Sequence, residues 1–198
     1  MIITPSIRSN VFLNAHPKGI QAYVLSLFQE AETFQKFSGP KNVLIIGGSS
    51  GYGLTSRVAL AVASGANTLN VSFEGEPSDK KTGSAGFWNN VYFLEEAKKL
   101  KTKHVDIVAD AFSEQTKKEV IARIKKEFGK VDLVIYSLAA GARPNPKTGD
   151  LVRSALKPIG EPIDGDTIDV ATKNSKTTSY GCCNRRRHQQ YSLCHGWF

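Results

Sequence analysis

The residues with the clearest chemical role form one glycine-rich segment, Gly47-Gly48-Ser49-Ser50-Gly51-Tyr52-Gly53. It lies between a short apolar run and a segment in which apolar residues recur at helical spacing. Glycines permit a tight turn and a close approach of the backbone to a pyrophosphate, and the N-terminus of the next helix presents free N–H groups and a partial positive charge. The segment therefore predicts a phosphate-binding turn with nucleotide contacts from Gly47, Gly48, Ser49, Ser50, Gly51 and Tyr52. The alternative is a turn that only joins a strand to a helix.

An acidic residue, Glu74, follows the next strand-like run, 21 residues beyond Gly53. A carboxylate at that place accepts hydrogen bonds from both hydroxyls of the adenosine ribose. It also repels a 2′-phosphate, so the sequence predicts NADH as the cofactor rather than NADPH. Phe73 is then expected beside the ribose or the adenine. The alternative for Glu74 is a surface residue at a strand end.

Two further pairs of residues end later strand-like runs. Asp110-Ala111 closes the third run, where the carboxylate can reach the adenine amino group, although Asp110 is also well placed to cap the next helix. Leu138-Ala139 ends the fourth run, where small or apolar residues let the backbone pass under the cofactor. The sequence thus predicts cofactor contacts from all four residues.

These residues require a framework of strands that alternate with helices. Strands are expected at residues 42–46, 68–73, 105–108 and 131–138, and helices at 18–35, after 53, at 89–100 and at 113–128. The pattern predicts an α/β fold with a Rossmann-type, doubly wound parallel sheet of which only the first half is present. The inward helix residues are expected to be Leu54, Val58, Ala61, Val62, Val120, Ile121, Ile124 and Phe128.

The remaining segments show no such alternation. Residues 140–170 are rich in Gly, Pro and Asp and are expected to form an extended loop, and residues 171–198 show neither helical nor strand periodicity. The predicted organisation is an N-terminal extension with a helix (1–40), an NADH-binding half-domain (41–168) and an irregular, non-native tail (169–198). Without further strands, the sheet is expected to expose apolar surface beside its fourth strand.

Charge and cysteines concentrate in the tail. The net charge is +8, but residues 1–170 contribute only +3, and residues 171–198 hold five positive charges and no acid. Binding of nucleic acid by the Arg185–Arg187 run is the minor alternative and no such partner is predicted. Cys182, Cys183 and Cys194 fit the Cys-x(2–4)-Cys spacing of zinc sites poorly, so no metal is predicted.

No apolar run approaches the roughly 20 residues of a membrane span, and the N-terminus lacks the pattern of a secretory signal. A cytoplasmic location without membrane association is therefore expected. A monomer or an oligomer of unknown size is expected.

The chain resembles the FabV-type trans-2-enoyl-CoA and enoyl-ACP reductases, a branch of the short-chain dehydrogenase/reductase superfamily, over about residues 1–168. The spacing Gly47-x-x-x-Gly51-x-Gly53 differs from the dehydrogenase form Gly-x-Gly-x-x-Gly and is similar to that of this superfamily. The other segments that carry the resemblance are Met1–Pro5, Ile7-Arg8, His16-Pro17, Val43–Leu54, Phe73-Glu74, Asp110–Phe112, Gly129–Val134, Tyr136–Ala139 and Arg153–Gly160.

The resemblance implies reduction of the trans-2 double bond of an enoyl-CoA or enoyl-ACP thioester in fatty acid biosynthesis. NADH would deliver hydride to the β-carbon, a tyrosine would stabilise the developing enolate, and a lysine would hold the cofactor ribose. In the family this tyrosine and lysine are separated by eight residues and follow the fourth strand.

No such pair follows the fourth strand here. Beyond Leu138 the tyrosines are Tyr180 and Tyr191, and the position nine residues after Tyr180 is Gln189. Tyr92 and Lys101 have the right spacing but lie between the second and third strands, so the match is interpreted as chance. No catalytic residue is predicted, and the chain is expected to be inactive; the alternative function is a non-catalytic NAD(H)-binding fragment.

A frameshift accounts for the unusual tail. One choice of synonymous codons for residues 184–198, read one nucleotide later, spells a segment similar to the family's continuation. We therefore expect a frameshift near residues 165–183 and a truncated chain. Sequencing of the encoding DNA tests this expectation.

Overall fold

A computed structural model describes residues 7–8, 11–12, 14–138, 140–145, 148–153, 161–169 and 172–180. The chain divides into two compact units. The first consists of Met1–Thr4 and Asn14–Ser137, and the second consists of Pro5–Leu13 and Leu138–Phe198.

The first unit is built on a four-stranded parallel sheet. Its strands are β3 (Asn42–Ile46), β4 (Asn67–Ser72), β5 (His104–Val108) and β6 (Leu133–Tyr136), in the order β5-β4-β3-β6. The register pairs Ile46 with Val71 of β4 on one side and with Tyr136 of β6 on the other. The chain leaves β3 toward β4 and later returns to β6 on the opposite side, so a topological switch point lies at the carboxyl ends of β3 and β6.

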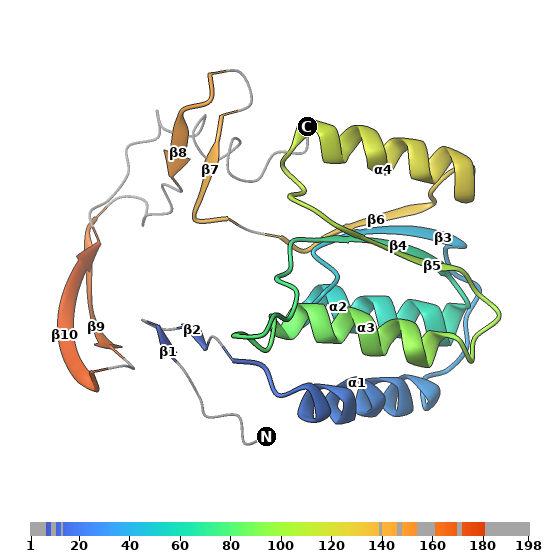
Figure 1. The fold of residues 1–198 in the computed structure, drawn as a ribbon, viewed down its shortest axis with the longest axis horizontal. Coiled ribbons are helices and arrows are strands. Elements are labelled where there is room, and N and C mark those ends of the chain that lie inside the picture. Colours follow the sequence, from blue (N-terminus) through green and yellow to red (C-terminus); the bar gives the residue numbers. More distant parts are fainter. Residues whose placement is uncertain are drawn as a thin grey trace. The chain divides into compact units, whose positions relative to one another are not determined.

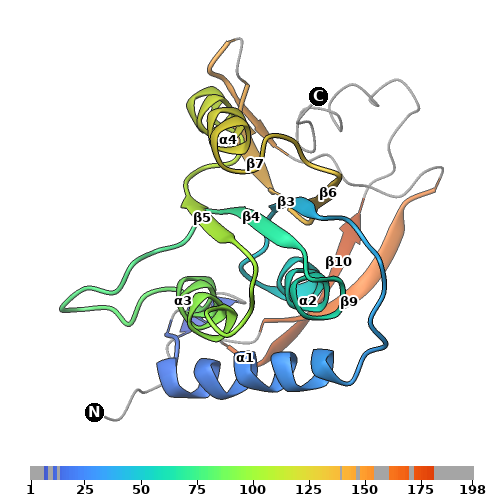
Figure 2. The ribbon, with the colours of Figure 1, turned by 90° about the vertical axis from the view of Figure 1, so that its right-hand side faces the viewer.

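Helices cover both faces of this sheet (Figure 1). Helices α2 (Gly51–Ala59) and α3 (Ala85–Ala97) lie on one face, with α1 (Pro17–Glu32) outside them, and α4 (Glu114–Glu127) lies on the other (Figure 2). A π-helical turn, η1 (Leu60–Ser64), continues α2 and ends at Gly65. The core between the three helices consists of Val24, Phe28, Ala31, Leu54, Val58, Ala61, Val62, Phe93 and Ala97. The predicted Rossmann-type class is confirmed, and the described residues form four parallel strands, the first half of a doubly wound sheet.

The elements of this unit follow the sequence prediction to within four residues at each end, and two of the differences have a clear structural reason. Helix α3 begins four residues before the predicted start at 89, because the hydroxyl of Ser84 accepts a hydrogen bond from the Phe87 amide and caps the helix. Ile121 was expected to face inward but is 51% exposed, whereas Val120 is fully buried. Only a narrow stripe of α4 therefore contacts the sheet.

The second unit contains short antiparallel pairs, so the predicted loop at 140–170 and the absence of strands after 171 are wrong. β7 (Ala142–Pro144) pairs with β8 (Leu151–Arg153), and β9 (Ile163–Asp169) pairs with β10 (Asn174–Tyr180); β1 (Ile7–Arg8) pairs with β2 (Val11–Phe12). Apart from Ile163, Ile168 and Tyr180, β9 and β10 consist of polar residues and glycine, so hydropathy alone did not reveal them. Directly before β10, the Lys173 amide donates to the Asp169 carbonyl, and Lys173 has a φ of 59°.

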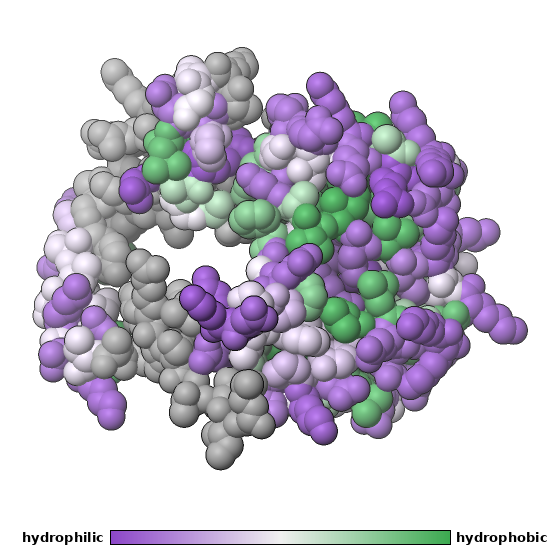
Figure 3. Space-filling model, viewed as in Figure 1, coloured by the Kyte–Doolittle hydropathy of each residue, from purple (hydrophilic) through white to green (hydrophobic). Residues whose placement is uncertain are grey.

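Apolar side chains reach the surface beside the fourth strand, as predicted. Leu133 and Val134 of β6 are 37% and 52% exposed, and Val108 of β5, at the opposite edge of the sheet, is also exposed. Hydrophobic side chains interrupt the hydrophilic surface of the first unit at the level of the sheet (Figure 3). In the part of the chain that the structure describes, no helix is long and apolar enough to cross a membrane.

A buried polar chain links α2 to strands β4 and β5 beneath the sheet. Arg57 is fully buried, contacts Asp106 Oδ1 through its Nη1 at 2.8 Å, and places its guanidinium carbon 3.8 Å from the centre of the Phe93 ring. Its Nε donates to Thr68 Oγ1, which lies 2.9 Å from Nδ1 of His104. Burial and the nearby Arg57 charge lower the pKa of His104 to about 4. His104 is therefore neutral near pH 7, which allows its half-buried position.

The pKa of His104 predicts a loss of stability in acid. In the unfolded chain, His104 is protonated near pH 6.5, whereas in the folded chain it is protonated only near pH 4. The contribution of neutral His104 to the free energy of unfolding is therefore fully present above pH 6.5 and is lost as the pH falls toward 4. We expect a loss of about 2 kcal/mol over this interval, after a discount for the partial exposure of the ring.

Urea denaturation at a series of pH values measures this effect. His104→Asn removes the titrating group and is expected to flatten the profile between pH 6.5 and 4. His16→Asn is the control, since His16 is an exposed helix cap and asparagine also caps helices. An unchanged pH profile in His104→Asn contradicts the assignment.

Candidate functional site

The glycine-rich turn joins the end of β3 to the start of α2, as the sequence predicts. Gly47 has a φ of 88° and Gly51 a φ of 51°, conformations that side chains other than glycine rarely adopt. The Gly47 amide donates to the Val71 carbonyl at 2.8 Å, which holds the start of the turn against β4. The first amides of α2, which have no acceptor within the helix, then point out of its N-terminus toward the carboxyl ends of the strands.

A close backbone contact sets the position of α2. A Cβ placed on Gly53 would lie 2.1 Å from the carbonyl oxygen of Gly47. Only glycine fits at position 53, because it has no side chain. Helix α2 therefore lies closer to the turn than it could with any other residue at this position. This contact brings the helix N-terminus over the turn.

Buried amide side chains support the turn from below. Asn70 of β4 is fully buried, and its Oδ1 accepts a hydrogen bond from the Gly48 amide at 2.8 Å. Asn89 of α3 donates to the Ser49 carbonyl at 2.8 Å. The Nδ2 of Asn70 donates to Asp106, which continues the chain to Arg57. The sequence analysis did not identify Asn70 or Asn89; the signal available for Asn70 was its position between the apolar Leu69 and Val71.

Glu74 and the glycine-rich turn come together, although they follow different strands. The Oε1 of Glu74 accepts a hydrogen bond from Ser49 Oγ at 2.5 Å, and its Oε2 accepts one from Ser84 Oγ at 2.5 Å. Each carboxylate oxygen keeps a further lone pair, so these bonds leave capacity for a ligand. Ser49 and Glu74, which the sequence predicts separately as cofactor contacts, therefore form one polar cluster at the carboxyl ends of β3 and β4.

Two aromatic side chains lie on the segments that form this cluster. Tyr52 in the first turn of α2 is 88% exposed, and Phe73, directly after β4, is 80% exposed. Exposed flat rings of this kind offer a face for stacking or for contact with a sugar. Their contact with a cofactor remains a prediction.

The other predicted residues lie at the carboxyl ends of β5 and β6. The carboxylate of Asp110 accepts a hydrogen bond from the Phe112 amide at 2.9 Å, so it orders the turn before α4, while Ala111 is buried. The N-cap of α4 is Ser113 rather than Asp110. The Ser137 amide donates to the Ile46 carbonyl at the end of β3. Leu138 follows in the second unit, and Ala139 lies outside the described residues.

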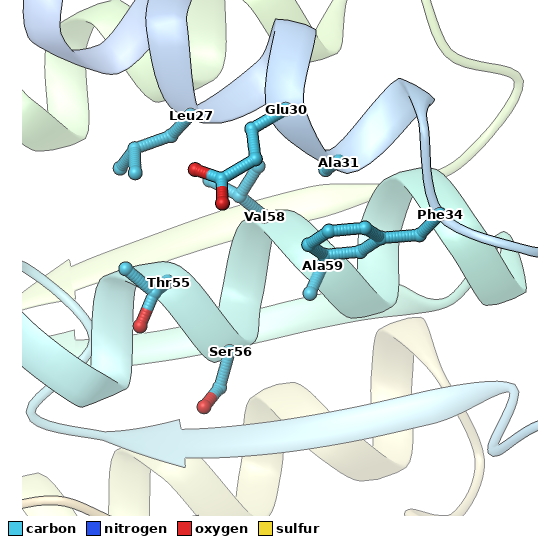
Figure 4. Close-up of a pocket in the computed structure, with 8 residues that line it drawn as sticks. All are labelled: Leu27, Glu30, Ala31, Phe34, Thr55, Ser56, Val58 and Ala59. Atoms are coloured by element: carbon cyan, nitrogen blue, oxygen red, sulfur yellow. The ribbon is translucent and has the colours of Figure 1, made fainter.

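A separate cleft lies between α1 and α2, with a volume of about 290 Å³ (Figure 4). Leu27, Glu30 and Phe34 line it from one side, and Thr55, Ser56 and Ala59 line it from the other. None of the predicted cofactor residues borders this cleft, so it is not the site. Tyr92 lines a second cleft, with Lys18 and Gln21 of α1, which is consistent with interpreting its spacing to Lys101 as chance.

No group of three or more potential metal ligands occurs among the described residues. Cys182, Cys183 and Cys194 lie outside them, as do Tyr191 and residues 185–187.

The parallel sheet, the switch point and the glycine-rich turn together define a Rossmann-type dinucleotide-binding unit. Comparison with known families narrows the class. Residues 2–79 match the family described as the NAD(P)H binding domain of trans-2-enoyl-CoA reductase, and residues 81–191 match the trans-2-enoyl-CoA reductase catalytic region. The chain therefore belongs to the trans-2-enoyl-CoA reductase family, as the sequence resemblance predicted.

Individual relatives agree with this assignment. An enoyl-[acyl-carrier-protein] reductase [NADH] of Photobacterium profundum is 45% identical over 91% of this chain and 46% of its own length. A trans-2-enoyl-CoA reductase [NADH] of Clostridium beijerinckii is 43% identical over 90% of this chain and 45% of its own. The crystal structure of a Clostridium acetobutulicum trans-2-enoyl-CoA reductase in complex with NADH is 37% identical and superposes with a TM-score of 0.84, covering 96% of this chain and 48% of that chain. The chain thus spans less than half the length of the relatives it matches.

The contact between Gly53 and Gly47 yields a stability prediction. In Gly53→Ala, the added Cβ meets a backbone oxygen that no side-chain rotation can move aside. We expect a loss of about 2–3 kcal/mol in the free energy of unfolding. Chemical denaturation measures it, and Gly141→Ala, where a Cβ meets nothing within 4 Å, is the control. Equal stability of the two variants contradicts the prediction.

Proposed function

We propose that residues 14–138 form the NADH-binding half of a reductase acting on trans-2-enoyl thioesters. The observation that carries the proposal is the hydrogen bond between Ser49 and Glu74, which joins the glycine-rich turn to the acid that follows the neighbouring strand. Around this bond, helix α2 directs its first amides toward the place of a pyrophosphate, and Glu74 lies toward the place of the adjoining ribose. The residues present therefore fit a dinucleotide.

Glu74 favours NADH over NADPH for an electrostatic reason. Its carboxylate is already bonded to two hydroxyl donors, so its remaining lone pairs are available to the ribose hydroxyls. A 2′-phosphate at the same position would bring two negative charges together. The proposed cofactor contacts also include Tyr52, Phe73, Asp110, Ala111, Leu138 and Ala139.

The proposed reaction is the family's reduction of an enoyl-CoA or enoyl-ACP thioester. NADH supplies the hydride that adds to the β-carbon, and a proton completes the reduction at the α-carbon. Two candidate functions remain for this chain, because its sequence beyond Leu138 offers no tyrosine followed nine positions later by lysine. It either catalyses this reduction or only binds NADH, and the absent pair favours binding without turnover. A cytoplasmic location is part of the same proposal.

Loss of the Glu74 carboxylate is expected to weaken NADH binding. In Glu74→Ala, we expect the Kd for NADH to rise about tenfold, since a hydrogen bond to a charged group is removed. Titration by NADH fluorescence measures it. Glu119→Ala is the matched control, because Glu119 is exposed on α4 at the opposite face of the sheet. An unmodified chain with no measurable affinity for NADH refutes the proposal.

The missing tyrosine and lysine predict little or no turnover. Oxidation of NADH with crotonyl-CoA, followed by the loss of absorbance of the reduced cofactor, is expected to remain near the rate without enzyme. A complete relative assayed in parallel provides the reference. Turnover near that of the relative would show that this chain contains its own catalytic residues. It would contradict the candidate function of NADH binding without turnover.

A further inference from the structure

The first turn of α3 contacts Glu74 directly, although α3 follows the glycine-rich turn by more than thirty residues. Ser84 and Gly86 make the contact. Both lie in the segment that matches the catalytic region of the family, residues 81–191, and not in the segment that matches its NAD(P)H binding domain.

Ser84 holds one oxygen of the carboxylate. Its hydroxyl oxygen accepts hydrogen bonds from the amides of Phe87 and Gly75, each at 3.2 Å. With both acceptor positions used, the single hydroxyl proton is directed to Glu74 Oε2 at 2.5 Å. The backbone of α3 therefore fixes the direction of this hydrogen bond.

Gly86 provides the space in which the carboxylate lies. A Cβ placed on Gly86 would lie 2.1 Å from Oε1, 2.3 Å from Cδ and 2.5 Å from Oε2 of Glu74. The whole carboxylate thus packs against the Cα of Gly86, and any side chain at position 86 would displace it. Glu74 is the flexible end of this contact, so its carboxylate would move while the helix stays in place.

We propose that Ser84 and Gly86 are positioning residues that determine the selectivity for NADH over NADPH by holding the Glu74 carboxylate in one place. An unrestrained glutamate side chain samples several rotamers, and a 2′-phosphate can then be accommodated when the carboxylate turns away. The bonds to Ser49 and Ser84 and the packing on Gly86 remove this freedom. The inference rests on the proposed function, because it assumes that Glu74 lies beside the cofactor ribose.

The test is the ratio of the Kd for NADPH to the Kd for NADH, measured by fluorescence titration of the full chain. In Ser84→Ala and in Gly86→Ala we expect this ratio to fall about tenfold, the equivalent of one hydrogen bond to a charged group. Ser84→Thr keeps the hydroxyl and is expected to keep the ratio. Ser113→Ala is the control, since Ser113 caps α4 on the opposite face without a side-chain hydrogen bond.

Double variants show whether the effect passes through Glu74. In a Glu74→Ala background, Ser84→Ala and Gly86→Ala are expected to leave the ratio unchanged, because the group that they position is gone. Gly86→Ala also separates positioning from folding: alanine has the higher helix propensity, so the thermal midpoint is not expected to fall. If Ser84→Ala does not fold, Gly86→Ala retains the helix cap and is sufficient for the test.

Each outcome has a distinct meaning. If the unmodified chain binds no NADH, the proposed function fails, and this inference fails with it. If the unmodified chain prefers NADH but Gly86→Ala keeps the same ratio, only the inference is overturned. A fall in the ratio that persists in the Glu74→Ala background also overturns it, because the residues would then act independently of the carboxylate.

Discussion

The close approach of Gly53 to the carbonyl of Gly47 is the constraint on which the proposed site depends. It places the N-terminus of α2 directly over the turn that leaves β3, so that unpaired amides and the positive end of the helix dipole face the same region. Buried side chains then stabilise the turn from below, because Asn70 accepts a hydrogen bond from the Gly48 amide and Asn89 donates one to the Ser49 carbonyl. The turn is thus preorganised by the sheet and by α3, and not by its own sequence alone.

Helix α3 and its N-cap Ser84 lie in the second segment that matches a family model but form hydrogen bonds with residues of the first. The boundary between the two matched segments falls between residues 79 and 81. The structure places hydrogen bonds across this boundary, from Ser84 to Glu74 and from Asn89 to the Ser49 carbonyl. The polar cluster around Glu74 therefore includes residues of both matched segments, because a parallel sheet brings the carboxyl ends of its strands together at one edge.

The edge of the sheet at β6 exposes apolar side chains. Among the residues that the structure describes, β6 pairs only with β3, and Leu133 and Val134 expose much of their side chains. Exposed apolar edge strands pair readily with further strands or with other chains. In a doubly wound sheet the strands beyond the fourth occupy this position, and this chain spans less than half the length of its relatives.

The sequence by itself determined the parallel sheet, the position of the glycine-rich turn between a strand and a helix, and the position of Glu74 at the end of the next strand. These features depend on local signals: β-branched runs bounded by glycine, helical spacing of apolar residues, and an acid at a strand end. It did not reveal the strands β9 and β10, because their pairing depends on contacts between polar residues and leaves no hydropathy pattern. It also placed Ile121 inside, because periodicity identifies an apolar stripe but not how much of it a neighbour covers. Only the tertiary structure showed the buried chain from Asn70 to Arg57 and the contact of Glu74 with Ser84 and Gly86, since those residues come together through packing between elements distant in sequence.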